Sequence, residues 1–282
     1  MGKHIVFSQR CAVNYNRILG RCVEEVKKKI EKFVVDIVGQ NWLLSIIVLG
    51  NAMQVFQKII FWLFACCLPV LLITSTIGCE VNELRLYEYG FSKYEISQAT
   101  GLDSQQLRTV AQRLINYFDL RTDTAQVEVN KNGSAFNIFN ERELIHLADV
   151  RSLIQRDYWV QRGVFLLMVI CALALFFGFK SGWRMLVRGL FWGSAITLGL
   201  MIALAVWAFF GFEQFFILFH LVSFSNQYWM LNPATDYLIR LFPEGFFYDA
   251  ALLGYAVVIL EALIIGGVSW GVSKFIGRES QS

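Results

Sequence analysis

Four long apolar stretches constrain the fold of this chain more than any other feature of its sequence. They cover residues 59–78, 163–179, 189–212 and 250–273. A helix needs about 20 apolar residues to cross a bilayer, and the second stretch approaches this length when it is extended through Trp159. The sequence therefore predicts a mainly α, polytopic membrane protein with four transmembrane helices.

The composition supports this class of protein. Charged residues make up 17% of the chain and apolar residues 56%, whereas soluble domains carry roughly 25% charged residues. The net charge of +3 is too small to indicate a nucleic-acid partner. The cysteines show neither a CxxC motif nor metal-ligand spacing and are interpreted as apolar packing residues: Cys11, Cys22, Cys66, Cys67, Cys79 and Cys171.

Residues 1–52 differ from the rest of the chain because charged and apolar residues alternate in them. Lysines and glutamates are interspersed at near-helical spacing with apolar residues, namely Val23, Val26, Ile30, Phe33 and Ile37. This pattern predicts an amphipathic cytoplasmic helix. An alternative is that Met53 is the native start, because the transmembrane region begins just after it. In either case residues 53–282 form the membrane domain.

Basic residues near the ends of the spans predict the orientation of the protein. They collect before the first span, between the second and third spans, and after the fourth, as Lys27, Lys28, Lys29, Lys180, Arg184, Arg188, Lys274 and Arg278. Positive charge is typical of cytoplasmic loops. We therefore expect both termini in the cytoplasm, and residues 79–162 and 213–249 on the opposite, outer face.

The connection at residues 79–162 carries local signals of a small α+β domain. Asn132-Gly133 is a strong turn signal and predicts a β-hairpin over residues 127–139. Asn140, followed three residues later by Glu143, is a capping-box pattern. It predicts the start of a helix that continues towards the second span.

The second connection, residues 213–249, is unusually apolar for a solvated loop, so we expect it to lie in the outer headgroup region. Pro233 and Pro243 bracket a short predicted helix. In that helix Asp236 and Arg240 stand four residues apart and are expected to form a structural ion pair rather than a catalytic one.

Two histidines are the main candidates for chemistry. His146 and His220 are the histidines beyond residue 4, and the predicted topology places both on the outer face. Imidazole titrates near neutrality, so it can take a proton from one group and return it to another within a single reaction. For each of them, a hydrogen-bonded packing role is the alternative.

Polar and aromatic residues accompany each histidine. Asp149 lies three residues after the first histidine on the same helical face, where it can orient the ring, and Glu143 lies three residues before it. Near the second histidine, Asn226 can donate to an oxyanion, as amides do in acyl transfer. Tyr228 and Trp229 are expected either to anchor this segment at the membrane interface or to bind a lipid substrate.

Several kinds of site are not indicated. The sequence has no GxSxG motif and no Ser or Cys nucleophile at a recognised spacing from these histidines. Two histidines without a clear third ligand make a zinc site weak, so we expect neither metal nor cofactor. General acid/base chemistry on a group of the substrate remains. Glu261, an acid within the fourth span, is a further candidate, with a neutral or internally hydrogen-bonded carboxyl as the alternative.

Two segments resemble the paired signatures of one protein family. They cover residues 139–150 and residues 219–229, and the second continues through Pro233, Asp236, Pro243, Phe246 and Phe247. A Leu-Tyr-Glu-Tyr stretch at residues 86–89 adds to the likeness. The segments are similar to those of the bacterial lipoprotein intramolecular transacylases, which are membrane proteins with four spans. The resemblance covers roughly residues 55–275.

The resemblance implies a specific reaction at the bacterial plasma membrane. Its substrate would be a lipoprotein, embedded among membrane lipids, whose N-terminal cysteine carries a diacylglyceryl group. One acyl chain would move from the glycerol to the cysteine α-amino group, giving the lyso form without a covalent enzyme intermediate. The family's two essential histidines map onto His146 and His220. On this basis one histidine would deprotonate the α-ammonium, and the other, with Asn226, would stabilise the tetrahedral intermediate or protonate the departing alkoxide; the sequence does not indicate which histidine has which role. The chain departs from the family pattern at Gln227 and Asn232, where acidic residues are usual.

Two other functions fit the same sequence. A four-span protein with an aromatic outer groove can hold a lipid or a partner helix without reacting with it. A lipid acyl hydrolase would use the same acid/base groups but would release free fatty acid.

Overall fold

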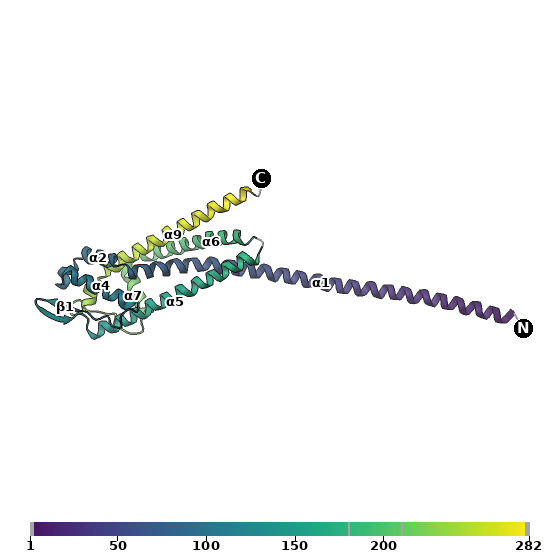
Figure 1. Ribbon diagram of the computed structural model, residues 1–282, viewed down its shortest axis with the longest axis horizontal. Helices are drawn as coiled ribbons and strands as arrows, with labels where there is room; N and C mark the ends of the chain where they lie inside the picture. Colours follow the sequence, from purple (N-terminus) through teal and green to yellow (C-terminus); the bar gives the residue numbers. More distant parts are fainter. Residues whose placement is uncertain (1–2, 180, 210, 280–282) are drawn as a thin grey trace. The chain divides into compact units, whose positions relative to one another are not determined.

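The computed structural model describes residues 3–179, 181–209 and 211–279 and is mainly helical (Figure 1). The elements are α1 (Lys3–Asn82), α2 (Leu84–Lys93), α3 (Ile96–Thr100), α4 (Ser104–Phe118), β1 (Glu128–Lys131), β2 (Ser134–Asn137), α5 (Glu141–Gly178), α6 (Gly182–Phe209), α7 (Phe212–Ser223), α8 (Tyr237–Leu241) and α9 (Glu244–Glu279). Within these residues, four segments are long and apolar enough to cross a membrane: Asn51–Asn82, Glu141–Gly178, Gly182–Ala205 and Glu244–Phe275. The predicted fold class is confirmed.

The chain divides into two compact units, residues 1–59 and residues 60–282. The first unit is helical from Lys3, and its described charged side chains are exposed; Glu24 and Lys28 lie 4.0 Å apart. The apolar side chains on which the amphipathic prediction rested lie outside the described part of the chain. Both histidine-bearing segments belong to the second unit.

The apolar helices of the second unit pack through buried aliphatic side chains and glycine. Leu68 of α1, Met201 of α6 and Val258 of α9 share one buried cluster. A Cβ added at Gly193 of α6 would lie 2.8 Å from the carbonyl oxygen of Ala65 on α1. Glycine at this position therefore allows α6 to approach the backbone of α1 closely, as small residues do between membrane helices.

A second buried cluster forms the core of the α+β domain. The domain consists of α2, α3, α4, the β-hairpin, the first half of α5, and α8. Its core residues include Ile96, Val110, Leu114, Leu147 and Leu241. Since α5 and α8 both contribute to this core, the domain joins the beginning of one long helix to the connection that precedes α9.

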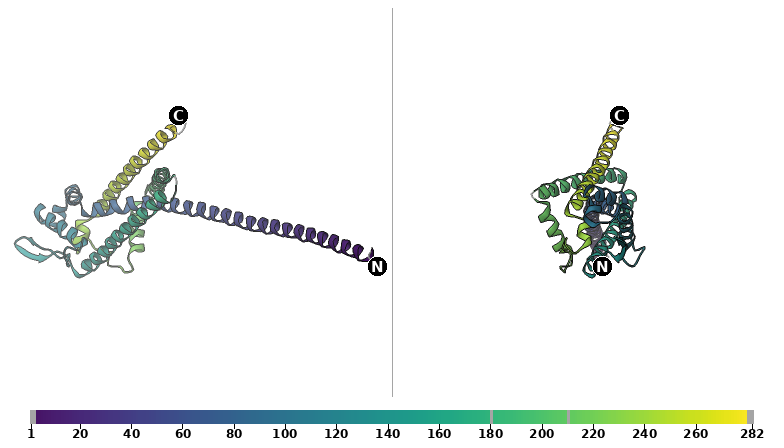
Figure 2. Two further views of the ribbon diagram at one scale, coloured as in Figure 1. Left: turned by 45° about the vertical axis from the view of Figure 1, so that its right-hand side comes forward. Right: turned by 90° about the vertical axis from the view of Figure 1, so that its left-hand side faces the viewer.

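The predicted β-hairpin is confirmed at its turn. Strands β1 and β2 pair antiparallel with Lys131 opposite Ser134. Asn132 and Gly133, between them, have φ angles of 54° and 83°, and positive φ at both positions is what a type I′ turn requires. The hairpin lies near the beginning of α5 (Figure 1, and the left view of Figure 2).

α5 is one continuous helix that leads from the α+β domain into the apolar bundle. Its N-terminus has the predicted capping box between Asn140 and Glu143. The helix has 38 residues, which correspond to about 57 Å, whereas the hydrocarbon core of a bilayer is about 30 Å thick. The first turns of α5 therefore extend beyond its apolar part.

The boundary between the second and third spans differs from the prediction. α6 begins at Gly182, so Arg184 and Arg188, which were expected in a loop, lie in its first two turns. Lys180 lies outside the described residues. The helix starts early because no proline separates these arginines from the apolar run that follows, and a single glycine, Gly189, is tolerated within a helix.

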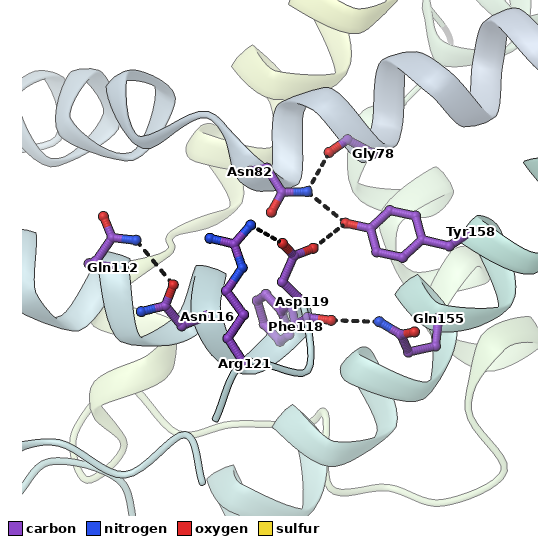
Figure 3. A network of polar contacts seen from close by, with 9 residues as sticks. All are labelled: Gly78, Asn82, Gln112, Asn116, Phe118, Asp119, Arg121, Gln155 and Tyr158. Atoms are coloured by element: carbon purple, nitrogen blue, oxygen red, sulfur yellow. Dashed lines mark hydrogen bonds and ion pairs between the residues drawn. The ribbon is translucent and has the colours of Figure 1, made fainter. Parts of the chain in front are cut away.

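A polar network fastens the middle of α5 to α1 and α4 (Figure 3). Asn82 Nδ2, at the end of α1, donates to the Tyr158 hydroxyl at 2.6 Å, and that hydroxyl donates to Asp119 Oδ1 at 3.3 Å. Gln155 Nε2 donates to the carbonyl of Phe118 at 2.7 Å. These bonds hold α5 about three turns beyond His146.

Candidate active site

The structure brings the two candidate histidines together. His146 lies in the second turn of α5, and His220 lies in the last turn of α7. Their ring centroids are 6.0 Å apart and the rings are inclined by 33°. Both side chains are buried, with 7% and 8% of their surface exposed. The sequence predicted the candidates; the contact between them comes from the fold.

Aromatic rings and one backbone carbonyl surround His220. Its ring centroid is 4.3 Å from that of Phe216 and 4.9 Å from that of Trp229. Nδ1 of His220 lies 2.7 Å from the Phe216 carbonyl oxygen, which can only accept a hydrogen bond, so Nδ1 carries the proton. In the neutral ring Nε2 is then the free acceptor. Burial lowers the pKa of His220, and the bond to Phe216 partly opposes that shift.

His146 contacts the same aromatic cluster from the side of α5. Its ring meets Phe224 edge-on with centroids 5.1 Å apart, and Phe224 also lies 5.6 Å from the His220 ring. Nδ1 of His146 is buried and has no hydrogen-bond partner within the described part of the chain. Within the described residues, Nδ1 of His146 is therefore uncommitted, beside an aromatic ring that it shares with His220.

Asp149 is hydrogen-bonded to Asn226 rather than to Nδ1 of His146, and its role in orienting that ring stays a prediction. Its Oδ2 accepts a hydrogen bond from Asn226 Nδ2 at 2.8 Å, while Nδ1 of the neighbouring His146 has no partner among the described residues. Asn226 can reach the Asp149 carboxylate because the segment after α7 returns alongside α5. Helical spacing alone could not show this arrangement. Asn226 Oδ1 accepts from the Tyr228 backbone N–H at 3.0 Å. Nδ2 carries two N–H groups and one of them bonds to Asp149, so the second can donate to another acceptor.

Glu143 makes backbone contacts rather than histidine contacts in this structure. It is 1% exposed, and its carboxylate accepts from the Asn140 N–H at 2.7 Å and from the Leu238 N–H at 2.6 Å. It thus caps α5 and binds the first turn of α8 at the same time. Its supporting role in catalysis stays a prediction.

The ion pair predicted between Asp236 and Arg240 is wrong in its detail. Arg240 Nε donates to the backbone carbonyl of Asp236 at 3.1 Å. The buried carboxylate of Asp236 instead accepts from Asn140 Nδ2 at 2.9 Å and from the Asn232 N–H at 2.7 Å. Asp236 is the N-cap residue of α8, but its side chain makes no capping bond to that helix; it bonds to the segment that precedes α8 and to Asn140.

The other residues predicted near His220 lie around it with different degrees of contact. Trp229 is half-buried and its ring is inclined by 36° to that of His220. Tyr228 is 40% exposed and contacts Asn226 through its backbone N–H. Trp229 therefore covers the second histidine directly, whereas Tyr228 does not.

The two departures from the family pattern do not point at the histidines. Gln227 is exposed, and its backbone carbonyl accepts from Arg142 Nη2 at 2.7 Å. Asn232 Oδ1 accepts from the Ala234 N–H at 3.0 Å. A carboxylate at position 232 could accept the same bond from the Ala234 N–H. The amide of Asn232 therefore retains the acceptor that an acid would supply there.

Glu261 lies apart from the histidine cluster. It is fourteen residues beyond Phe247 on α9, or roughly 21 Å along the helix, and Phe247 is the α9 residue that contacts Phe216. Oε2 of Glu261 is buried without a hydrogen-bond partner among the described residues. No three His, Cys, Asp or Glu side chains group as metal ligands within those residues.

Sequence reasoning missed the residues that act through backbone or ring contacts. Phe216 supplies the carbonyl that sets the tautomer of His220, Phe224 touches both imidazoles, and Arg142 holds the Gln227 carbonyl. The spacing of Phe216 four residues before His220 could have indicated the first of these contacts, because a side chain near a helix end can reach the carbonyl one turn back.

A family model and a relative of known sequence match this chain. The family model of the lipoprotein intramolecular transacylase Lit matches residues 62–247. An uncharacterized protein of Aquifex aeolicus is 28% identical over 138 residues, which are 48% of this chain; the match spans 57% of the length of that protein.

Solved structures show the same fold. The membrane integral lipoprotein intramolecular transacylase Lit from Bacillus cereus aligns with a TM-score of 0.64 at 20% identity, over 81% of this chain and 99% of the other. A variant of that protein with one histidine replaced by alanine gives a TM-score of 0.65 at 19% identity, over 82% and 99% of the two chains.

Proposed function

Because the chain belongs to the lipoprotein intramolecular transacylase family, whose model matches residues 62–247, we propose that it moves an acyl chain within a diacylglyceryl-modified lipoprotein. The acyl group leaves a glycerol ester oxygen and joins the α-amino group of the N-terminal cysteine. The observation that supports this most is the contact between His146 and His220, with ring centroids 6.0 Å apart.

The proposed step balances without an enzyme nucleophile. The cysteine amine attacks the ester carbonyl carbon, a C–N bond forms, and the C–O bond to glycerol breaks. Nε2 of His220 accepts a proton from the amine and returns it to the glycerol oxygen, because Nδ1 is already bonded to the Phe216 carbonyl. His146 and the remaining N–H of Asn226 stabilise the tetrahedral oxyanion.

The surroundings of the histidines support a lipid substrate. Apolar residues of α7 near the site are exposed, with Leu221 at 59% and Val222 at 79%, and large exposed apolar surfaces mark contacts with lipid or protein. Together with the distribution of basic residues, this favours a site on the outer face of the plasma membrane, both termini in the cytoplasm, and residues 53–282 as the membrane domain.

The purified chain in nanodiscs, incubated with a synthetic diacylglyceryl lipopeptide, tests this function. The reaction is an isomerisation, so the intact mass of the lipopeptide should stay constant while tandem mass spectrometry locates one acyl chain on the cysteine nitrogen. Loss of one acyl chain as free fatty acid would identify a hydrolase instead. An unchanged lipopeptide would leave binding without reaction as the function.

A further inference from the structure

Hydrogen bonds join the N-terminus of α5 to the start of α8. Asn140 Nδ2 donates to Asp236 Oδ1 at 2.9 Å, and Glu143 accepts from the Leu238 N–H at 2.6 Å. The two carboxylates are 5% and 1% exposed. Asn140 itself is exposed, but the carboxylates that accept these bonds are withdrawn from water, so breaking one bond leaves a buried acceptor with one partner fewer.

These bonds lie at the ends of the two segments that carry the histidines. His146 is one helical turn after Glu143, and Asp236 closes the segment that begins at His220. Between them, Asn226 of the same segment bonds to Asp149 of α5 at 2.8 Å. The segment 220–236 is therefore fixed to α5 on either side of His146, and the Asp236 bond sets one of the two attachment points.

The groups around Asp236 stabilise its charged carboxylate in one position. Burial opposes its ionisation, but hydrogen bonds from the Asn232 N–H, Thr235 and Asn140, together with the charge of Arg142, lower its pKa below the usual value. A charged acceptor makes stronger hydrogen bonds than a neutral one. The hydrogen bond from Asn140 to the Asp236 carboxylate is therefore stronger than the bond that Asn140 would make to an amide at position 236.

We propose that Asp236, paired with Asn140, is a positioning residue that sets the distance between His146 and His220. It does not touch the reacting atoms. The part of this inference that concerns rate rests on the proposed function, whereas the part that concerns the geometry of the two rings does not.

An exchange of the bonded pair tests the proposal. The variants are Asp236→Asn, Asn140→Asp and the double exchange, with Asn137→Asp, an exposed residue of β2, as matched control. Asn140→Asp alone opposes two carboxylates. Asp236→Asn alone keeps one acceptor oxygen and replaces the other by an amide NH₂, so Asn140 Nδ2 and the Asn232 N–H, which bond to separate oxygens of Asp236, are left with one acceptor between them. The double exchange again pairs one donor with one acceptor and keeps a good N-cap residue at position 140.

The chain has three histidines, so selective histidine labelling allows the imidazole resonances to be followed by NMR. Each single exchange should shift the resonances of His146 and His220 and lower kcat by about tenfold or more, with KM changed less than about twofold, because small displacements of catalytic groups are costly in rate. The double exchange should return the resonances and restore kcat to within about threefold.

The proposal would be overturned if the single exchanges left the imidazole resonances and kcat unchanged. It would also be overturned if the double exchange restored neither quantity beyond the more impaired single variant. So would a loss of kcat that merely follows the unfolded fraction at the assay temperature. If the unaltered chain transfers no acyl group, the proposed function fails, but the resonances still decide whether Asp236 positions the two rings.

Discussion

Replacement of His146 or His220 by glutamine is expected to slow acyl transfer by about 10²- to 10⁴-fold, the range over which general acid/base groups contribute. Glutamine is close to histidine in size and keeps an amide donor, but it cannot accept and return a proton at neutral pH. The two rings share Phe224 and lie 6.0 Å apart by their centroids, so neither residue can substitute for the other without moving this cluster. Rates are read from the appearance of N-acyl lipopeptide by mass spectrometry.

His4→Gln is the matched control, because it makes the same change in the unit that does not carry the site. It should transfer at the rate of the unaltered chain. Retention of that rate in both the His146→Gln and His220→Gln variants, with unchanged unfolding temperatures, would remove the two histidines from the mechanism.

The second large effect is expected on stability, from Glu143→Leu. This change removes the acceptor for two backbone N–H groups, those of Asn140 and Leu238, at a residue that is 1% exposed. The N–H of buried Leu238, left unpaired, costs about 1–3 kcal/mol, whereas water can satisfy the N–H of the exposed Asn140. The variant should therefore unfold at a clearly lower temperature in detergent. Glu143→Gln retains one carbonyl acceptor and should lose less.

Glu141→Leu is the control for this change, since Glu141 is an acidic residue of the same first turn but is exposed. Loss of its favourable interaction with the helix N-terminus is worth only about 0.3–1 kcal/mol. Equal unfolding temperatures for the Glu143→Leu and Glu141→Leu variants would show that the buried bonds to Asn140 and Leu238 contribute little.

Features encoded by neighbouring residues could be predicted from the sequence. The four apolar runs, the Asn132-Gly133 turn and the Asn140–Glu143 capping box all appear, although the helix of the third run begins at Gly182 rather than at residue 189. Each depends on interactions within a few residues or on burial in lipid, so no knowledge of distant segments was needed.

The bonding of the site could not be predicted, because it depends on which segments return to which helix. Asp149 has a partner 77 positions away, Asn226, although the residue three positions before it is His146. For Asp236, the spacing of four residues indicated Arg240, but the fold supplies Asn140 from α5 instead. Side-chain partners of this kind are set by the packing of α5 against the segment after α7.

The most direct test of an intramolecular transfer by these histidines is an isotope-mixing experiment. Two diacylglyceryl lipopeptides of different sequence, one with deuterated acyl chains, are incubated together with the protein, and the products are analysed by tandem mass spectrometry. The proposed mechanism predicts that each peptide carries only its own acyl chain on the cysteine nitrogen. Deuterated chains on the unlabelled peptide would show transfer between molecules or through an acyl-enzyme, and would contradict it.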